Sequence, residues 1–297
     1  MDGVVTAEMD PAATAAGPTA EPVAGPAIEP VAEPVAGPSI ELVAEPVAEP
    51  AAEPVEITGS VHSYDVSTGV DGPGTRFVLF TAGCPLRCLY CANPDTWRMR
   101  DGTRMTVSEV LDEIGKYRRF IQVSGGGVTI TGGEPLLQPR FTGAVLRRCR
   151  ELGLHTALDT SGYLGDRADD ALLADISLVL LDIKAWDASL YRRITGADLH
   201  PTLRFARRLA RLGRPAWIRY VLVPGLTDRL DHVDALAAFV AKLPNVEHVD
   251  VLPYHRLGMF KYERLGLRYP LEGVRPPEPE LLAQVHERFR AHGVVSR

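Results

Sequence analysis

The stretch RFVLFTAGCPLRCLYC, residues 76–91, joins an apolar run to a loop that carries three of the chain's four cysteines. The run Arg76–Thr81 predicts a buried β-strand, because its apolar residues are continuous rather than alternating. The loop that follows has the spacing Cys84-x-x-x-Cys88-x-x-Cys91. The sequence therefore places a group of candidate metal ligands directly after a strand.

Three cysteines within one short loop predict a metal or cluster site, whereas a disulfide scaffold would spread its cysteines through a much shorter chain. A [4Fe–4S] cluster has four irons, so three thiolates in one loop leave one iron open for another ligand. The alternative is a structural zinc ion completed by His62 or His155, although zinc motifs usually contain paired C-x₂₋₄-C units. The spacing favours the cluster and leaves zinc open.

A glycine-rich turn, Thr131-Gly132-Gly133-Glu134-Pro135, follows the next predicted strand. Two glycines let a ligand approach the backbone closely, and a carboxylate can hold an ammonium group. Alone, such a turn is more simply structural. At the end of the strand after the cysteine loop, it suits the amino end of S-adenosylmethionine (AdoMet), whose amino and carboxylate groups can fill an open iron position.

From residue 57 onward, predicted strands and amphipathic helices alternate about six times. Thr106 and Glu109 predict a capping box at the start of the first helix. The expected strands are Arg76–Thr81, Val128–Thr131, His155–Asp159, Leu178–Lys184, Ala216–Val223 and Val246–Leu252, and the expected helices are Thr106–Ile121, 140–152, Ala168–Ala174, Leu199–Leu212, Asp231–Leu243 and Glu280–His292. This alternation predicts an α/β fold, a partial (β/α)6 barrel with outer helices and with its chemistry at the carboxyl ends of the parallel strands.

Residues 1–55 differ in composition from the rest of the chain. A proline recurs at every fourth position from Pro18 to Pro54, except at Leu42. Such spacing excludes a helix, so we predict a disordered acidic tail over 1–55 and one core domain over 56–297. Eleven of the 38 acidic residues and none of the 32 basic ones lie in residues 1–56, so the remainder carries a basic excess that suits acidic partners.

The beginning of the chain lacks a basic segment followed by an apolar one, and no apolar run approaches the ~20 residues that span a bilayer. The cysteine pattern indicates a reducing compartment. We therefore expect a cytoplasmic monomer that binds neither membranes nor nucleic acid.

Beyond these inferences, the chain resembles the radical AdoMet superfamily and, within it, the pyruvate formate-lyase activating enzymes, over about residues 57–295. The resemblance rests on the cysteine loop, with Tyr90 before its last cysteine, and on the GGE turn. Further matching stretches are VDGPGTR (70–76), CANPDTW (91–97), SGGGVT (124–129), LDTSG (158–162), LDIK (181–184), WIRY (217–220) and LPYH (252–255). Residue 92 departs from the pattern, because it is Ala where some relatives carry His.

The resemblance implies an enzyme that cleaves AdoMet reductively at a [4Fe–4S] cluster under anaerobic conditions. The radical so formed would abstract hydrogen from a glycine of formate acetyltransferase (pyruvate formate-lyase), with electrons from flavodoxin or ferredoxin. The implied cluster ligands are Cys84, Cys88 and Cys91, and the implied AdoMet-binding residues are Tyr90, Asn93, Gly132, Gly133, Glu134, Asp159, Lys184, Arg219 and His255. Asp159, Thr160, Asp182 and the carbonyl of Leu180 match ligands of a Na⁺ or K⁺ ion, and Asp71 matches a residue near the incoming glycine.

Two alternatives stay open. The target could be another glycyl-radical enzyme, but many activating enzymes of that kind carry a ferredoxin-like insert whose clusters need about eight more cysteines. Only Cys149 is left over, and eight residues separate Trp97 from Thr106, so the insert is absent. The second alternative is a non-catalytic zinc-binding module.

Overall fold

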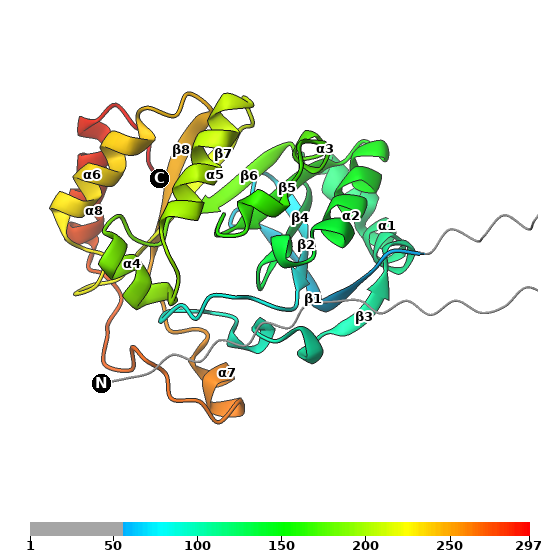
Figure 1. Cartoon of the computed structure of the whole chain (residues 1–297), viewed down its shortest axis with the longest axis horizontal. Coiled ribbons are helices and arrows are strands. Elements are labelled where there is room, and N and C mark those ends of the chain that lie inside the picture. The colour runs from blue at the N-terminus through cyan, green and yellow to red at the C-terminus, as the bar shows by residue number, and fades with distance from the viewer. Residues whose placement is uncertain (1–55) are drawn as a thin grey trace, which may run out of the picture. The chain divides into compact units, whose positions relative to one another are not determined.

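The computed structural model describes residues 56–297, and the predicted disordered tail over 1–55 lies outside the described residues. One eight-stranded sheet has the order β3-β1-β2-β4-β5-β6-β7-β8 (Figure 1). Its strands are β1 (Thr58–Thr68), β2 (Thr75–Thr81), β3 (Thr103–Thr106), β4 (Gly127–Gly132), β5 (His155–Thr160), β6 (Leu178–Asp182), β7 (Ala216–Leu222) and β8 (Val246–Pro253). From β2 to β8 all neighbours are parallel and follow chain order, which confirms the predicted partial barrel.

Helices connect the parallel strands on the outside of the sheet (Figure 1). They are α1 (Val107–Val123), α2 (Pro139–Glu151), α3 (Asp170–Ala174), α4 (Ala188–Thr195), α5 (His200–Arg211), α6 (Leu230–Val240), α7 (Met259–Arg264) and α8 (Pro279–Ala291). The capping box of α1 is confirmed, with the Glu109 amide donating to Thr106 Oγ1 at 3.1 Å and the Thr106 amide donating to Glu109 Oε2 at 2.7 Å. Short helices α4 and α7 are additional to the six that the sequence predicted.

Two antiparallel strands also extend the sheet beyond the prediction. β1 pairs antiparallel with both β2 and β3 at the β2 edge. The second half of β1 is polar and largely exposed, and β3 is only four residues long, so neither strand has the continuous apolar run that marks β2 and β6. A lateral antiparallel extension of this kind leaves the barrel open.

Along the inner face of the sheet, apolar side chains are followed by charged ones toward the carboxyl ends of the strands. Ala157, Leu178, Leu180 and Trp217 form a small apolar cluster there, separate from the large core beneath the helices. Because side chains on one face of a strand recur every second residue, the next inward positions are Asp159 on β5, Asp182 on β6 and Arg219 on β7. The fold thus sets three charged side chains at the carboxyl end of the sheet, above an apolar floor.

Across residues 56–297, no helix combines the length and apolar character that crossing a membrane requires.

Candidate active site

A cavity of about 560 Å³ lies at the carboxyl ends of the parallel strands. Fourteen of the sequence-predicted residues line it, namely Cys84, Cys88, Tyr90, Cys91, Asn93, Gly132, Gly133, Glu134, Asp159, Thr160, Asp182, Lys184, Arg219 and His255. Asp71 and Leu180 are not among its lining residues. The fold therefore gathers most of the predicted site in one place, from segments far apart in the sequence.

Backbone hydrogen bonds hold the cysteine loop from two sides. At its base, the amides of Gly83 and Cys84 donate to the carbonyls of Thr96 and Trp97 at 2.7 and 3.1 Å. Near its centre, the amides of Arg87 and Leu89 donate to carbonyls at the C-terminal end of α4, at 2.8 and 3.0 Å. The unpredicted helix α4 thus has a clear role, because it supplies acceptors that fix the position of the loop.

Burial dominates the ionisation of the three thiols. It raises the pKa of Cys84 to about 12 and the pKa of Cys88 to about 12. Burial also raises the pKa of Cys91, although hydrogen bonds from the Asn93 amide and the Trp97 indole partly oppose that change. The thiols therefore stay protonated in this setting until a metal replaces the protons, as expected of ligands that ionise on metal binding.

The glycines of the GGE turn are fixed by packing against the cysteine loop. A Cβ on Gly133 would lie 2.2 Å from the carbonyl oxygen of Gly83, and a Cβ on Gly132 would lie 2.4 Å from the amide nitrogen of Thr81. Gly132 also has φ +110°, which favours glycine. The sequence predicted that Gly132 and Gly133 let a ligand approach the backbone. The structure shows in addition that Gly133 packs against Gly83, the residue before Cys84.

Glu134 is buried, and its carboxylate is hydrogen-bonded within the protein. It accepts from Thr160 Oγ1 at 2.6 Å, from Ser161 Oγ at 2.5 Å and from the Ser161 amide at 3.0 Å. Burial raises the pKa of Glu134 in spite of these bonds. The carboxylate therefore joins the turn after β4 to the end of β5. Its predicted contact with the AdoMet amino group stays a prediction.

Two ion pairs occupy the wall of the cavity formed by β5, β6 and β7. Arg219 Nη1 lies 2.8 Å from Asp159 Oδ2, which also accepts from Thr131 Oγ1 at 2.8 Å. Lys184 Nζ lies 2.9 Å from Asp182 Oδ2. Burial raises the pKa of Asp159 to about 6, against the opposing charge of Arg219. Burial alone would lower the pKa of Lys184, but the charge and hydrogen bond of Asp182, together with the charges of Cys88 and Tyr90, outweigh burial, and the pKa is raised.

The Nε of Arg219 is buried and has no hydrogen-bond partner among residues 56–297. Buried polar groups are nearly always paired, so this unpaired donor, on a residue that lines the cavity, is a candidate partner for a polar ligand. This donor, the three thiols and the neighbouring carboxylates together fit a ligand with an anionic and a cationic end beside a cluster.

Asp71 lies beside the cavity rather than in its wall. Its carboxylate accepts from Ser67 Oγ at 2.5 Å, and its carbonyl accepts from Thr129 Oγ1 at 2.6 Å. Its neighbour Val70 lines the cavity and is 57% exposed. His255, also exposed, lines the cavity from the segment after β8.

The predicted cation ligands are arranged along two adjacent strands. Leu180 is the register partner of Asp159 on β5 and of Trp217 on β7, and its side chain belongs to the apolar floor. Thr160 Oγ1 donates to Glu134. The Na⁺ or K⁺ site stays a prediction.

The structure does not support a single zinc ion. Within residues 56–297, no three Cys, His, Asp or Glu side chains converge closely enough to hold one metal ion. The proposed fourth ligands are engaged elsewhere, because His62 lies 3.4 Å from Asp95 and His155 lies 3.0 Å from Arg76. A four-iron cluster does not require the three cysteines to converge on one metal ion, because each cysteine binds a different iron.

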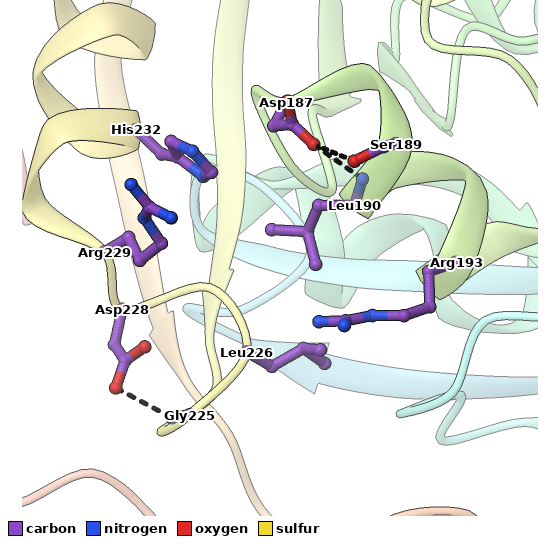
Figure 2. A pocket seen from close by; sticks show the side chains of 9 residues that line it. All are labelled: Asp187, Ser189, Leu190, Arg193, Gly225, Leu226, Asp228, Arg229 and His232. Carbon is purple, nitrogen blue, oxygen red and sulfur yellow. Dashed lines mark hydrogen bonds between the residues drawn. The ribbon is translucent and has the colours of Figure 1, made fainter.

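A second, smaller cavity of about 250 Å³ lies between α4 and the segment that leads into α6 (Figure 2). Its two carboxylates already have backbone partners, since Asp187 accepts from the Leu190 amide and Asp228 from the Gly225 amide (Figure 2). No sequence-predicted site residue lines this cavity.

Comparison with known proteins agrees with this geometry. The model of the Radical SAM superfamily matches residues 78–239, from the strand before the cysteine loop into α6. A radical SAM methyltransferase from Sphaerobacter thermophilus has the same fold, with a TM-score of 0.56 at 17% identity over 78% of this chain and 71% of that one. Fold and site together define a radical SAM protein, a class that carries a [4Fe–4S] cluster and uses AdoMet.

Sequence relatives identify the family within this class. The pyruvate formate-lyase-activating enzyme of Staphylococcus epidermidis is 42% identical over 246 residues, which cover 80% of this chain and 98% of the relative. The pyruvate formate-lyase 1-activating enzyme of Escherichia coli K12 is 41% identical over 241 residues, with the same coverage. The chain belongs to the family of pyruvate formate-lyase-activating enzymes.

Proposed function

We propose that this chain generates a glycyl radical on pyruvate formate-lyase (formate acetyltransferase). One observation carries the proposal: the three cysteines of the loop and the charged ends of β5, β6 and β7 line a single cavity, in a chain of this family. The cavity has the two kinds of group that the reaction requires, thiolates for a cluster and paired charges for a zwitterionic ligand.

Cys84, Cys88 and Cys91 would each bind one iron of the cluster and leave the fourth iron to AdoMet. When bound, the reduced cluster and AdoMet supply a 5′-deoxyadenosyl radical that can take a hydrogen atom from glycine. The protein's task is placement and the exclusion of water. The hydrogen bonds that the loop amides donate to carbonyls of Thr96, Trp97 and α4 hold the loop in place, which favours one geometry for the cluster.

The polar groups of the cavity would orient AdoMet. Arg219, with its unpaired Nε, suits the carboxylate of the ligand, while Asp159 and Asp182 provide negative charge for its ammonium and sulfonium groups. The remaining proposed contacts come from Tyr90, Asn93, Gly132, Gly133, Glu134, Lys184 and His255. We also propose that Na⁺ or K⁺ binds near Asp159, Thr160, Asp182 and the Leu180 carbonyl, where carboxylate oxygens are concentrated.

The partner's glycine would enter near Asp71. The residue belongs to the Val70–Thr75 turn, in which Gly72 and Gly74 both have positive φ. A Cβ on Gly74 would lie 2.6 Å from the amide nitrogen of Gly126, so this turn is packed tightly at its base. A fixed turn beside an open cavity suits recognition of a peptide loop.

Pyruvate formate-lyase is favoured over other glycyl-radical enzymes by the absence of a ferredoxin-like insert. β3 follows the cysteine loop closely and pairs directly with β1. The one remaining cysteine, Cys149, is fully buried on α2 in the apolar core. The chain would therefore use a single cluster. We also propose that it acts as a monomer.

The reaction needs one electron for each AdoMet cleaved, and we propose flavodoxin or ferredoxin as the donor. Free thiols and a reduced cluster require a reducing compartment, which we propose is the cytoplasm.

The function can be tested by anaerobic incubation of the reconstituted chain with AdoMet, a reductant and separate glycyl-radical enzymes. We expect a glycyl doublet in the electron paramagnetic resonance (EPR) spectrum of pyruvate formate-lyase. A doublet on a dehydratase or decarboxylase instead would assign the chain to another target. One bound zinc with no iron after reconstitution would refute the enzyme altogether.

A further inference from the structure

A fully buried arginine follows the Val70–Thr75 turn at the start of β2. Arg76 has 0% of its surface exposed. Its Nε donates to Thr129 Oγ1 at 3.0 Å, and its Nη2 donates to the carbonyl of Val128 at 2.6 Å. Its Nη1 donates to Nδ1 of His155 at 3.0 Å, so that ring is neutral. The guanidinium is therefore well hydrogen-bonded, but by uncharged groups.

This arrangement is costly for the fold. Among residues 56–297, the hydrogen-bond partners of Arg76 include no acidic side chain. A buried charge without an opposite charge destabilises a protein, and an apolar side chain in its place is often no less stable. The chain nevertheless leaves room for the group, because a Cβ on Gly127 would lie 2.8 Å from Arg76 Nη1. The cost indicates a role for Arg76 other than stability.

The guanidinium is connected to the Val70–Thr75 turn through one hydroxyl. Thr129 Oγ1 donates to the Asp71 carbonyl at 2.6 Å. Because a hydroxyl has a single proton, accepting from Arg76 leaves that proton to Asp71. The turn also lies directly on the guanidinium, since a Cβ on Gly72 would lie 3.4 Å from Arg76 Nε and the Pro73 carbonyl lies 3.5 Å from Nη1.

The turn reaches the edge of the cavity, whereas Arg76 and Thr129 lie outside its lining. Val70 lines the cavity and is 57% exposed. Thr131, two residues beyond Thr129 on the same face of β4, also lines the cavity and donates to Asp159. The Thr129 hydroxyl can thus hold the turn without contact with a ligand in the cavity.

We infer that Arg76, through the Thr129 hydroxyl, holds the Val70–Thr75 turn in the position that receives the glycine loop of the partner enzyme. This inference rests on the proposed function, which places that loop beside Asp71. Arg76 and Thr129 are positioning residues, because neither touches a reacting atom. A turn that is already fixed reduces the ordering cost of binding, so its release weakens binding of the partner more than it slows the chemistry.

The Thr129→Val variant keeps the shape of the side chain and removes the hydroxyl, so it disconnects the turn from Arg76. We expect the concentration of pyruvate formate-lyase that gives half the maximal rate of glycyl-radical formation to rise about fivefold, as for the loss of one hydrogen bond. The maximal rate should change much less. Thr129→Ser keeps the hydroxyl and should restore the parent's half-saturating concentration.

The matched control is Thr156→Val on β5. Thr156 is also 0% exposed, and its hydroxyl donates to the Asp175 carbonyl at 2.7 Å and accepts from the Ser177 amide at 3.0 Å. Both valine variants should unfold at a lower urea concentration than the parent, because each leaves a buried donor and a buried acceptor unpaired. Only Thr129→Val should change the half-saturating concentration of the partner.

A second variant, Arg76→Met, tests the same connection from its other end. It removes the buried charge together with its hydrogen bonds, so its folding does not depend on satisfying a guanidinium. We expect it to raise the half-saturating concentration of the partner as Thr129→Val does. The measurement follows the EPR doublet with time in the reconstituted full chain, at a series of pyruvate formate-lyase concentrations.

The outcomes distinguish the inference from the proposed function. An unchanged half-saturating concentration in Thr129→Val or Arg76→Met, whichever folds, would overturn the inference and leave the proposed function standing. An equal rise in Thr156→Val or in Thr129→Ser would also overturn it, because the effect would then come from lower stability or from packing. No doublet from the parent at any concentration of pyruvate formate-lyase would refute the proposed function, and the inference with it.

Discussion

Arg219 Nη1 lies 2.8 Å from Asp159 Oδ2, although β6 separates the two strands from which these side chains project. Both side chains are nearly buried, with 9% and 11% of their surface exposed. The pair thus forms a bridge across the inner face of the sheet, above the apolar floor and inside the cavity.

Removal of one partner should be more damaging than removal of both. Arg219→Met leaves the Asp159 carboxylate buried without its cation, and we expect a loss of about 3–5 kcal/mol in the free energy of unfolding. Arg219→Met combined with Asp159→Asn should recover most of that loss. Urea unfolding of the parent, the single variant and the double variant measures these free energies. The control is Arg193→Met, on the exposed side of α4, which should change the free energy of unfolding by less than about 0.5 kcal/mol. A double variant as unstable as the single one would contradict the account.

The turn after β4 should tolerate no side chain at its second glycine. Gly133→Ala places a Cβ 2.2 Å from the Gly83 carbonyl, so the cysteine loop must move. We expect a loss of about 3 kcal/mol or more and poor iron retention, since backbone cannot yield as a flexible side chain does. Gly115→Ala, on the exposed face of α1 where a Cβ meets nothing within 4 Å, is the matched control and should gain about 0.5–1 kcal/mol. Thermal unfolding and iron analysis report both effects, and a normal iron content in Gly133→Ala would show that the contact does not matter.

His155 should make the protein sensitive to acid. Arg76 Nη1 lies 3.0 Å from His155 Nδ1, and because arginine can only donate, this nitrogen accepts and the ring is neutral. Burial, and then the charge of Arg76, lower the pKa of His155 to about 4. Between the ordinary pKa near 6.5 and this value, the unfolded chain binds a proton that the folded chain does not, so stability falls as the pH falls.

The His155→Gln variant tests that linkage, because an amide oxygen can accept from Arg76 without titrating. We expect its free energy of unfolding to fall less between pH 6.5 and pH 4 than that of the parent. His200→Gln, at the exposed start of α5, serves as the control and should keep the parent's slope. Identical slopes for all three proteins in urea titrations would rule out the role given to His155.

The sequence was sufficient for the parallel core because burial on both faces leaves a continuous apolar signal. The run is unbroken in β2 and β6, whereas polar residues interrupt the other parallel strands, and the predicted bounds of all six differ from those observed by only a few residues. The cysteine loop and the GGE turn were likewise visible, because a metal site needs particular side chains at fixed spacing.

The remaining features depend on contacts between distant segments. Nothing near Arg219 in the sequence shows that its guanidinium pairs with Asp159, two strands away. The role of Gly133 as packing against Gly83 also appears only when β4 lies beside β2. α4 was missed, and its value lies in backbone carbonyls that carry no sequence signal.

The most direct test of the central claim follows a hydrogen atom from the partner to the cofactor. Pyruvate formate-lyase labelled with deuterium at the glycine α-carbon would be incubated anaerobically with the reconstituted chain, AdoMet and a reductant, beside a Cys88→Ala variant. We predict a glycyl radical by EPR and deuterium in the 5′-deoxyadenosine formed by the parent, with neither in Cys88→Ala. Unlabelled 5′-deoxyadenosine without a glycyl radical, or equal products from Cys88→Ala, would contradict the account.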